Sequence, residues 1–187
     1  MASPSEQLRY QATALQTLMS GVRADQWGNA TPCQQWTVRD LAAHLVGGGT
    51  MFAASFRGEE GPEEAEGSQY LLGDDPAAAL ARVLADFETS ADSPGAMERE
   101  VVLPFATLPA QVALDIAKFD LLVHAWDLAR ATGQTFDPPE DVVAEARQTA
   151  DAIVGGLRDG DTFRDAVAAP AGASAMDQLA AFTGRSV

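Results

Sequence analysis

Hydrophobic residues recur at helical spacing in five segments of the chain. In residues 5–22, Leu8, Leu15 and Val22 fall on one helix face. A second helix is predicted at about 38–56, because Thr37 can cap it and Asp40 takes the capping-box position. The other predicted elements are a third helix from Pro76 to about 91, a short extended piece at 99–103, a fourth helix from 107–109 to Gly133, a fifth from 137–139 to about 157, and short helical pieces after Gly160.

This element order predicts an all-α fold. The pattern contains no convincing strand pairs, and residues 57–74 read as a long acidic, glycine-rich connection. Links of roughly 16 to 18 residues on either side of the third helix leave room for crossover connections in a bundle. We therefore expect a single helical-bundle domain over residues 1–187, in which four helices are joined by an additional C-terminal one.

Charge and composition narrow the class of partners. The net charge of −15 disfavours nucleic acid and anionic membrane surfaces. No apolar run approaches the roughly 20 residues of a membrane span, and the N-terminus lacks the pattern of a secretory signal. The single cysteine, Cys33, agrees with a reducing compartment. We expect a cytoplasmic protein that acts on small molecules, and a homodimer is left open.

The chain has two histidines, and each follows an aspartate by four residues. Asp40 with His44, and Asp120 with His124, therefore share a helix face about one turn apart. The helix around Asp120 is apolar elsewhere, and a buried carboxylate needs a partner. If His44 faces the same cavity, two imidazoles and one carboxylate would suit Zn²⁺, Ni²⁺ or Fe²⁺. The spacing alone supports equally well an alternative in which each histidine hydrogen-bonds its own aspartate and no metal is bound.

Other chemistry-bearing residues have simpler interpretations. A small buried hydrophobe is the favoured role for Cys33, ahead of a fourth ligand. Trp126 is expected in the core, whereas Trp36 could belong to the core or to a pocket. Asp127 could accept a hydrogen bond from an imidazole, and Asp40 could do the same or cap its helix. The run of three glycines at 47–49 could admit a close helix or ligand, but it lacks the ending of a phosphate loop.

Two segments carry a family resemblance. Residues 31–47 (TPCQQWTVRDLAAHLVG) and 119–133 (FDLLVHAWDLARATG) resemble the DinB superfamily, and within it the metal-binding branch similar to mycothiol-dependent maleylpyruvate isomerase. The closing residues 181–185 (AFTGR) also fit. The resemblance implies a DinB-like bundle and makes His44, Asp120 and His124 the ligands of a divalent metal, most readily zinc. The isomerase has glutamate at the position of Asp120, and we expect no counterpart of its additional C-terminal domain.

The resemblance also implies a function. We expect a metal-dependent transferase or isomerase that activates a low-molecular-weight thiol such as mycothiol for attack on an electrophilic substrate. A metal-dependent hydrolase is an alternative, since the same open site could activate water. A metal-binding or small-ligand-binding protein without turnover is a third interpretation, which would be favoured if a fourth protein ligand closed the site.

Overall fold

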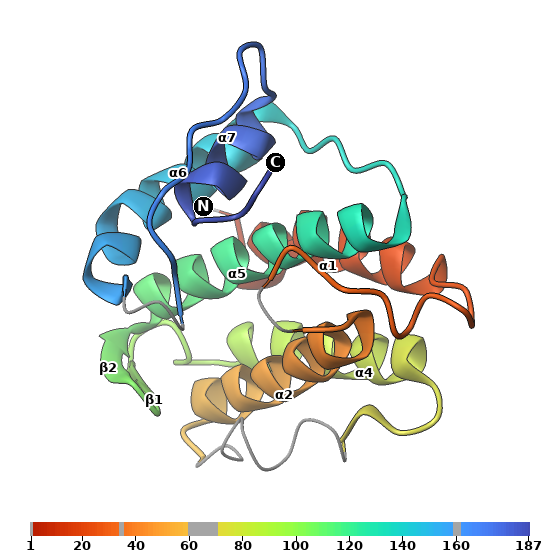
Figure 1. Cartoon of the computed structure of the whole chain (residues 1–187). Coiled ribbons are helices and arrows are strands. Elements are labelled where there is room, and N and C mark those ends of the chain that lie inside the picture. Colours follow the sequence, from red (N-terminus) through yellow and green to blue (C-terminus); the bar gives the residue numbers. More distant parts are fainter. Residues whose placement is uncertain (1, 34–35, 60–70, 159–161) are drawn as a thin grey trace.

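Four helices form the body of the molecule in this computed structural model, which describes residues 2–33, 36–59, 71–158 and 162–187. They are α1 (Pro4–Ser20), α2 (Val38–Arg57), α4 (Pro76–Ala91) and α5 (Ala110–Thr132), as Figure 1 shows. Helices α1 and α2 each pack against both α4 and α5. The predicted all-α bundle is therefore confirmed.

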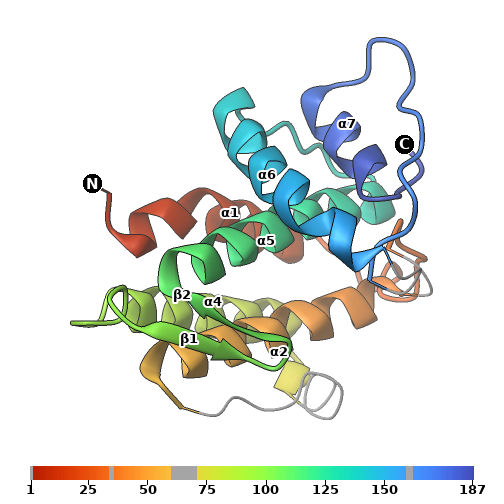
Figure 2. The ribbon, with the colours of Figure 1, turned by 90° about the vertical axis from the view of Figure 1, so that its left-hand side faces the viewer.

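The C-terminal elements cover the outer side of α5. Helix α6 (Glu140–Ile153) packs on α5 and continues as a short 3₁₀ helix, η1 (Val154–Leu157). Helix α7 (Ala175–Phe182) then packs on both α6 and α5 (Figure 2). Phe119, Val123 and Trp126 of α5 form a second hydrophobic cluster with these helices. Trp126 lies in the core, as its sequence context predicted.

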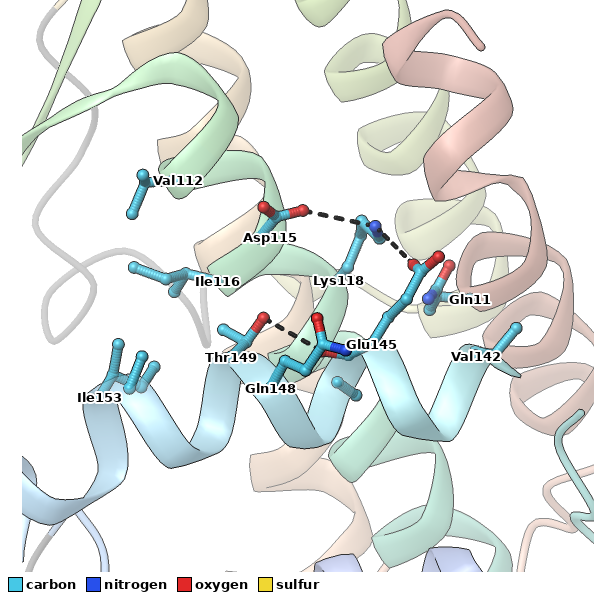
Figure 3. Close-up of a pocket in the computed structure, with 12 residues that line it drawn as sticks. Gln11, Val112, Asp115, Ile116, Lys118, Val142, Glu145, Gln148, Thr149 and Ile153 are labelled. Carbon is cyan, nitrogen blue, oxygen red and sulfur yellow. Dashed lines mark hydrogen bonds and ion pairs between the residues drawn. The ribbon is translucent and has the colours of Figure 1, made fainter. Parts of the chain in front are cut away.

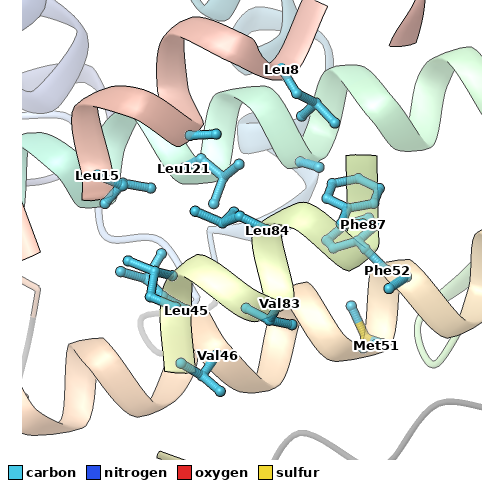
Figure 4. Close-up of a cluster of buried hydrophobic side chains, with 14 of the residues drawn as sticks. Leu8, Leu15, Leu45, Val46, Met51, Phe52, Val83, Leu84, Phe87 and Leu121 are labelled. Carbon is cyan, nitrogen blue, oxygen red and sulfur yellow. The ribbon is translucent and has the colours of Figure 1, made fainter. Parts of the chain in front are cut away.

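The main core lies between the four helices of the bundle. Leu8, Leu45, Leu84 and Phe87 are among its fully buried side chains, and Figure 4 shows them converging from α1, α2 and α4. Helix α4 approaches α2 closely at Gly49, where an added Cβ would lie 3.2 Å from Val83 Cγ1. The glycine run therefore does admit a close helix.

A β-hairpin precedes α5, and here the prediction of no strand pairs was wrong. Strand β1 (Glu100–Leu103) pairs antiparallel with β2 (Ala106–Pro109). β1 buries alternate residues, but four residues are too few for that period to stand out in the sequence. The helix start predicted at 107–109 was one to three residues early, because β2 occupies Ala106–Pro109 and α5 begins at Ala110.

Other boundaries differ by a few residues. Helix α1 stops at Ser20, just before Gly21, and α6 tightens into η1 where Gly155 and Gly156 follow Val154. Most of the long connection predicted at 57–74 lies outside the described residues. Among the helices that the structure describes, none is both long enough and apolar enough to cross a membrane.

Candidate metal centre

His44 is placed by the start of α2. Thr37 accepts a hydrogen bond from the Asp40 backbone N–H, and Asp40 accepts one in return from the Thr37 N–H. This capping box fixes the first turn of the helix and presents His44 toward α5 almost two turns later. The capping interpretation of Asp40 is confirmed by these bonds.

Asp120 and His124 lie one turn apart on α5, and the structure brings them together with His44. The His44 Nε2 atom is 3.5 Å from one oxygen of Asp120, and the His124 Nε2 atom is 3.3 Å from the other. One ligand atom from each of the three residues lies within 4.8 Å of the other two. Of the two arrangements that the spacing left open, the structure shows the one in which the Asp120 carboxylate is shared between the two imidazoles.

A second layer of contacts holds His124 from the other side of its ring. His124 Nδ1 lies 3.0 Å from Asp127, whose side chain is 0% exposed. Arg185 donates to both oxygens of Asp127, at 2.9 Å and 2.8 Å. Asp127 is therefore an acceptor for an imidazole, as considered from the sequence. Arg185 was not predicted as a site residue. The clue to it was that a buried aspartate requires a positively charged partner.

Trp36, just before α2, lies beside the two histidines. Thr31 binds the carbonyl groups of Cys33 and Trp36 through its hydroxyl, and a backbone bond joins Thr31 to Trp36. The Trp36 ring lies 4.7 Å from that of His44 and 5.8 Å from that of His124, centre to centre. Trp36 is thus a wall of the site as well as a packing residue.

Cys33 lies closer to this chemistry than the sequence indicated. Its side chain is half-buried, and Sγ lies within 4.8 Å of ligand atoms of His124 and Asp127. The pKa of the thiol is raised to about 11, mainly by burial and in part by the carboxylates of Asp127 and Asp120, while Arg185 opposes the rise. The role of Cys33 as a small buried hydrophobe stays a prediction, but its neighbours include an imidazole and a carboxylate.

The charges at the centre favour ionised carboxylates. Burial raises the pKa of Asp120, but His124 and His44 outweigh it and bring that pKa well below its ordinary value. Burial likewise opposes ionisation of Asp127, whose pKa is nevertheless lowered by Arg185 and His124. Among the described ion pairs, Asp120 faces the two imidazoles and no lysine or arginine. It can therefore offer a negatively charged oxygen to a cation.

The spacing of the ligand atoms is compatible with a metal ion bound between them. Bonds of about 2.1 Å at a tetrahedral angle would put two ligand atoms about 3.4 Å apart. The Asp120 separations of 3.5 Å and 3.3 Å match this value. The N–H···O bonds of proteins are shorter, about 2.7–3.2 Å, as the contact between His124 and Asp127 illustrates. The residues present therefore suit a divalent cation.

A separate cavity of about 510 Å³ lies between α5 and α6. Figure 3 shows Lys118 in it, bridging Asp115 of α5 and Glu145 of α6. The lining includes none of the three candidate ligands. Because its lysine is already neutralised by two carboxylates, this cavity is a weaker candidate for catalysis than the His–Asp–His cluster.

Comparison with known proteins agrees with the fold and the two motifs. Residues 8–129 match the family described as the mycothiol maleylpyruvate isomerase N-terminal domain. The chain belongs to this family. The resemblance carried by the two sequence segments is thereby confirmed. The matched range contains His44, Asp120 and His124, and it ends before α6, α7 and Arg185.

Relatives and solved structures extend the match. Proteins from two strains of Mycobacterium tuberculosis, each described as uncharacterized, are 38% identical over 179 residues, 93% of either chain. The crystal structure of a mycothiol-dependent maleylpyruvate isomerase is similar with a TM-score of 0.64 and 21% identity, and a mutant of it with 0.65 and 20%. Both alignments cover 82% of this chain and 72% of the isomerase chain. At this identity the likeness shows the fold.

Proposed function

We propose that this protein binds one divalent metal ion through His44, Asp120 and His124, and that it is an enzyme using a low-molecular-weight thiol. The observation that carries the proposal is the shared carboxylate of Asp120, which lies at metal-ligand spacing from two imidazole nitrogens. Zinc suits two nitrogen ligands and one oxygen ligand best, and nickel or iron would also accept them.

The exposure of the ligands favours a catalytic centre over a closed structural one. The Asp120 side chain keeps 38% of its surface exposed, whereas that of His124 keeps 7%. Three protein ligands leave positions for an exogenous group, and the partial exposure of Asp120 is consistent with access for that group. The Trp36 ring limits access from the side of the imidazoles.

A metal held here would lower the pKa of a thiol in the open position, so that the thiol binds as thiolate. The residues of the chain have complementary tasks. Asp120 contributes the negative charge, and Asp127 fixes the His124 ring through Nδ1. Trp36 offers an apolar surface to the substrate. Mycothiol is the thiol we propose, because the solved isomerases of this fold are described as dependent on it.

Metal binding is tested with protein purified without chelator. Elemental analysis should give about one divalent metal per chain, or reconstitution with Zn²⁺ should restore it. His44→Ala and His124→Ala should each abolish binding measured by titration calorimetry, whereas Cys33→Ala should leave it nearly unchanged. Metal-free protein that resists reconstitution would refute the proposed centre, and loss of metal from the Cys33 variant would make that thiol a ligand.

Turnover is tested with the metal-loaded protein. Mycothiol is supplied with electrophiles, maleylpyruvate among them, and product is followed with zinc, without zinc, and with glutathione replacing mycothiol. We expect conversion that needs both metal and thiol. Conversion without thiol would indicate the hydrolase alternative, and metal binding without any conversion would indicate a binding protein.

A further inference from the structure

His124 lies between two groups of possible metal ligands. Its Nε2 atom lies 3.3 Å from Asp120, which forms one group with His44, and its Nδ1 atom lies 3.0 Å from Asp127, which forms the other group with Cys33. Each group brings its three ligand atoms within 4.8 Å of one another. A neutral imidazole carries one proton, so a ring that binds metal through Nε2 must hold the proton on Nδ1. The two groups therefore compete for one ring.

Arg185 binds the Asp127 carboxylate, which belongs to the second group. Its guanidinium donates to one Asp127 oxygen from Nε at 2.9 Å and to the other from Nη2 at 2.8 Å. The remaining nitrogen, Nη1, donates to the Thr183 hydroxyl at 3.0 Å, and that hydroxyl donates to the Ala180 carbonyl. Two-point binding of this kind fixes both the carboxylate and the arginine.

The backbone turn that delivers Arg185 is equally constrained. Gly184 has a φ of +89°, a conformation that favours glycine, and a Cβ there would lie 2.6 Å from Arg164 Cβ. Arg185 itself is 7% exposed. Burying an arginine carries a desolvation penalty unless its charge is paired, and here the charge is paired with Asp127.

We propose that Arg185 is a positioning residue that commits His124 to offer Nε2 to the metal. With Arg185 on both oxygens, Asp127 can still accept the Nδ1 proton of His124 but cannot bind a cation without displacing the guanidinium. A metal on the Cys33–His124–Asp127 group would also stand beside the positive charge of Arg185. Arg185 thus keeps this second group empty. The inference rests on the proposed metal centre.

The test uses Arg185→Gln and Arg185→Lys in the full chain. Glutamine removes the charge, whereas lysine keeps the charge but not the two-point fork. Arg23→Gln is the matched control, because Arg23 is exposed and pairs with the exposed Asp25. If Arg185→Gln fails to fold, Arg185→Lys carries the same measurements with smaller changes in the same direction.

The first measurement is made without metal, by NMR of protein with ¹⁵N in its histidine rings. The chain has two histidines, so His124→Ala assigns the signals. Wild type and Arg23→Gln should show a slowly exchanging proton on Nδ1 of His124. Arg185→Gln should lose that protection. The same protected proton in Arg185→Gln would overturn the inference.

The second measurement is the optical spectrum on titration with Co²⁺. Wild type should show no sulfur-to-cobalt charge-transfer band, since Cys33 stays outside the centre. Arg185→Gln should bind Co²⁺ at the first group about 10- to 100-fold more weakly. It should also gain the sulfur band, which adding Cys33→Ala removes. A merely structural arginine would change stability without producing that band.

Two results separate this inference from the function it rests on. A sulfur band in wild type, or an Arg185→Gln spectrum and affinity like those of wild type, would overturn the role of Arg185 while leaving a metal centre in place. Wild type that binds no Co²⁺ would overturn the proposed centre. In that case the metal-free NMR measurement still decides whether Arg185 holds the Nδ1 proton.

Discussion

Replacing Asp120 with asparagine separates a metal ligand from a hydrogen-bonded helix residue. The amide has nearly the shape of the carboxylate but no charge. In the structure the two Asp120 oxygens lie 3.5 Å and 3.3 Å from the imidazole nitrogens of His44 and His124. If these three atoms hold a metal, Asp120→Asn should bind it at least roughly tenfold more weakly, because losing a ligand exceeds the 10- to 100-fold cost typical of outer contacts.

That loss converts into a measurable difference in stability. A metal at 100 times its dissociation constant stabilises the folded wild type by about 2.7 kcal/mol. The same metal concentration is only tenfold above the weakened constant of the variant and stabilises it by about 1.4 kcal/mol. For a chain of 187 residues the difference of about 1.3 kcal/mol corresponds to roughly 3 to 5 °C in the midpoint of thermal unfolding.

The assay is thermal unfolding of both proteins with and without Zn²⁺ at matched protein concentration. Comparing the metal-induced shift within each protein removes any effect of the substitution on the metal-free fold. Asp115→Asn is the control, because Asp115 lies on the same helix, is 37% exposed and pairs with Lys118. Equal metal-induced shifts in wild type and Asp120→Asn would refute the assignment and return Asp120 to the role of a carboxylate bonded to His124.

Three further substitutions and one chemical modification test the packing and the electrostatics. Gly48→Ala, which meets no atom within 4 Å in the middle of α2, should raise the unfolding free energy by about 0.5–1 kcal/mol in urea titration, whereas Gly49→Ala should gain less because its Cβ meets Val83. Leu84→Ala should cost about 2–5 kcal/mol by the same titration, since Leu84 is fully buried. Alkylation of metal-free Cys33, followed by mass spectrometry, should be roughly a hundredfold slower at neutral pH than that of a free thiol and should accelerate as the pH approaches about 11, because burial raises the pKa of Cys33.

The sequence predicted the helices that carry the centre because each has strong local signals. Thr37 and Asp40 mark the start of α2, and the apolar run ended by Gly133 marks α5. The spacing of Asp120 and His124 also placed them on one face. Nothing in the local pattern showed that His44 would reach them, since that depends on how α2 packs on α5. Only the family resemblance supplied that third residue.

The parts that were missed depend on contacts far along the chain. Arg185 and Asp127 are 58 residues apart, and only the fold makes them partners. Cys33 was assigned by its distance in sequence from His44, but its Sγ lies within 4.8 Å of ligand atoms of His124 and Asp127. The hairpin escaped because each strand has four residues, which is shorter than a periodic signal needs.

The proposed role of Arg185 couples the C-terminal turn to the metal centre in both directions. The candidate ligands lie within the family match of residues 8–129, whereas Arg185 follows α7 beyond it. If Arg185 strengthens metal binding 10- to 100-fold, the coupling free energy is about 1.4–2.8 kcal/mol. Linkage is reciprocal, so a bound metal must stabilise the docked position of Arg185 by the same amount. The C-terminal turn, which supplies no ligand, would thus contribute to the free energy of metal binding. Arg185 would be docked less firmly in the metal-free protein than in the metal-bound one.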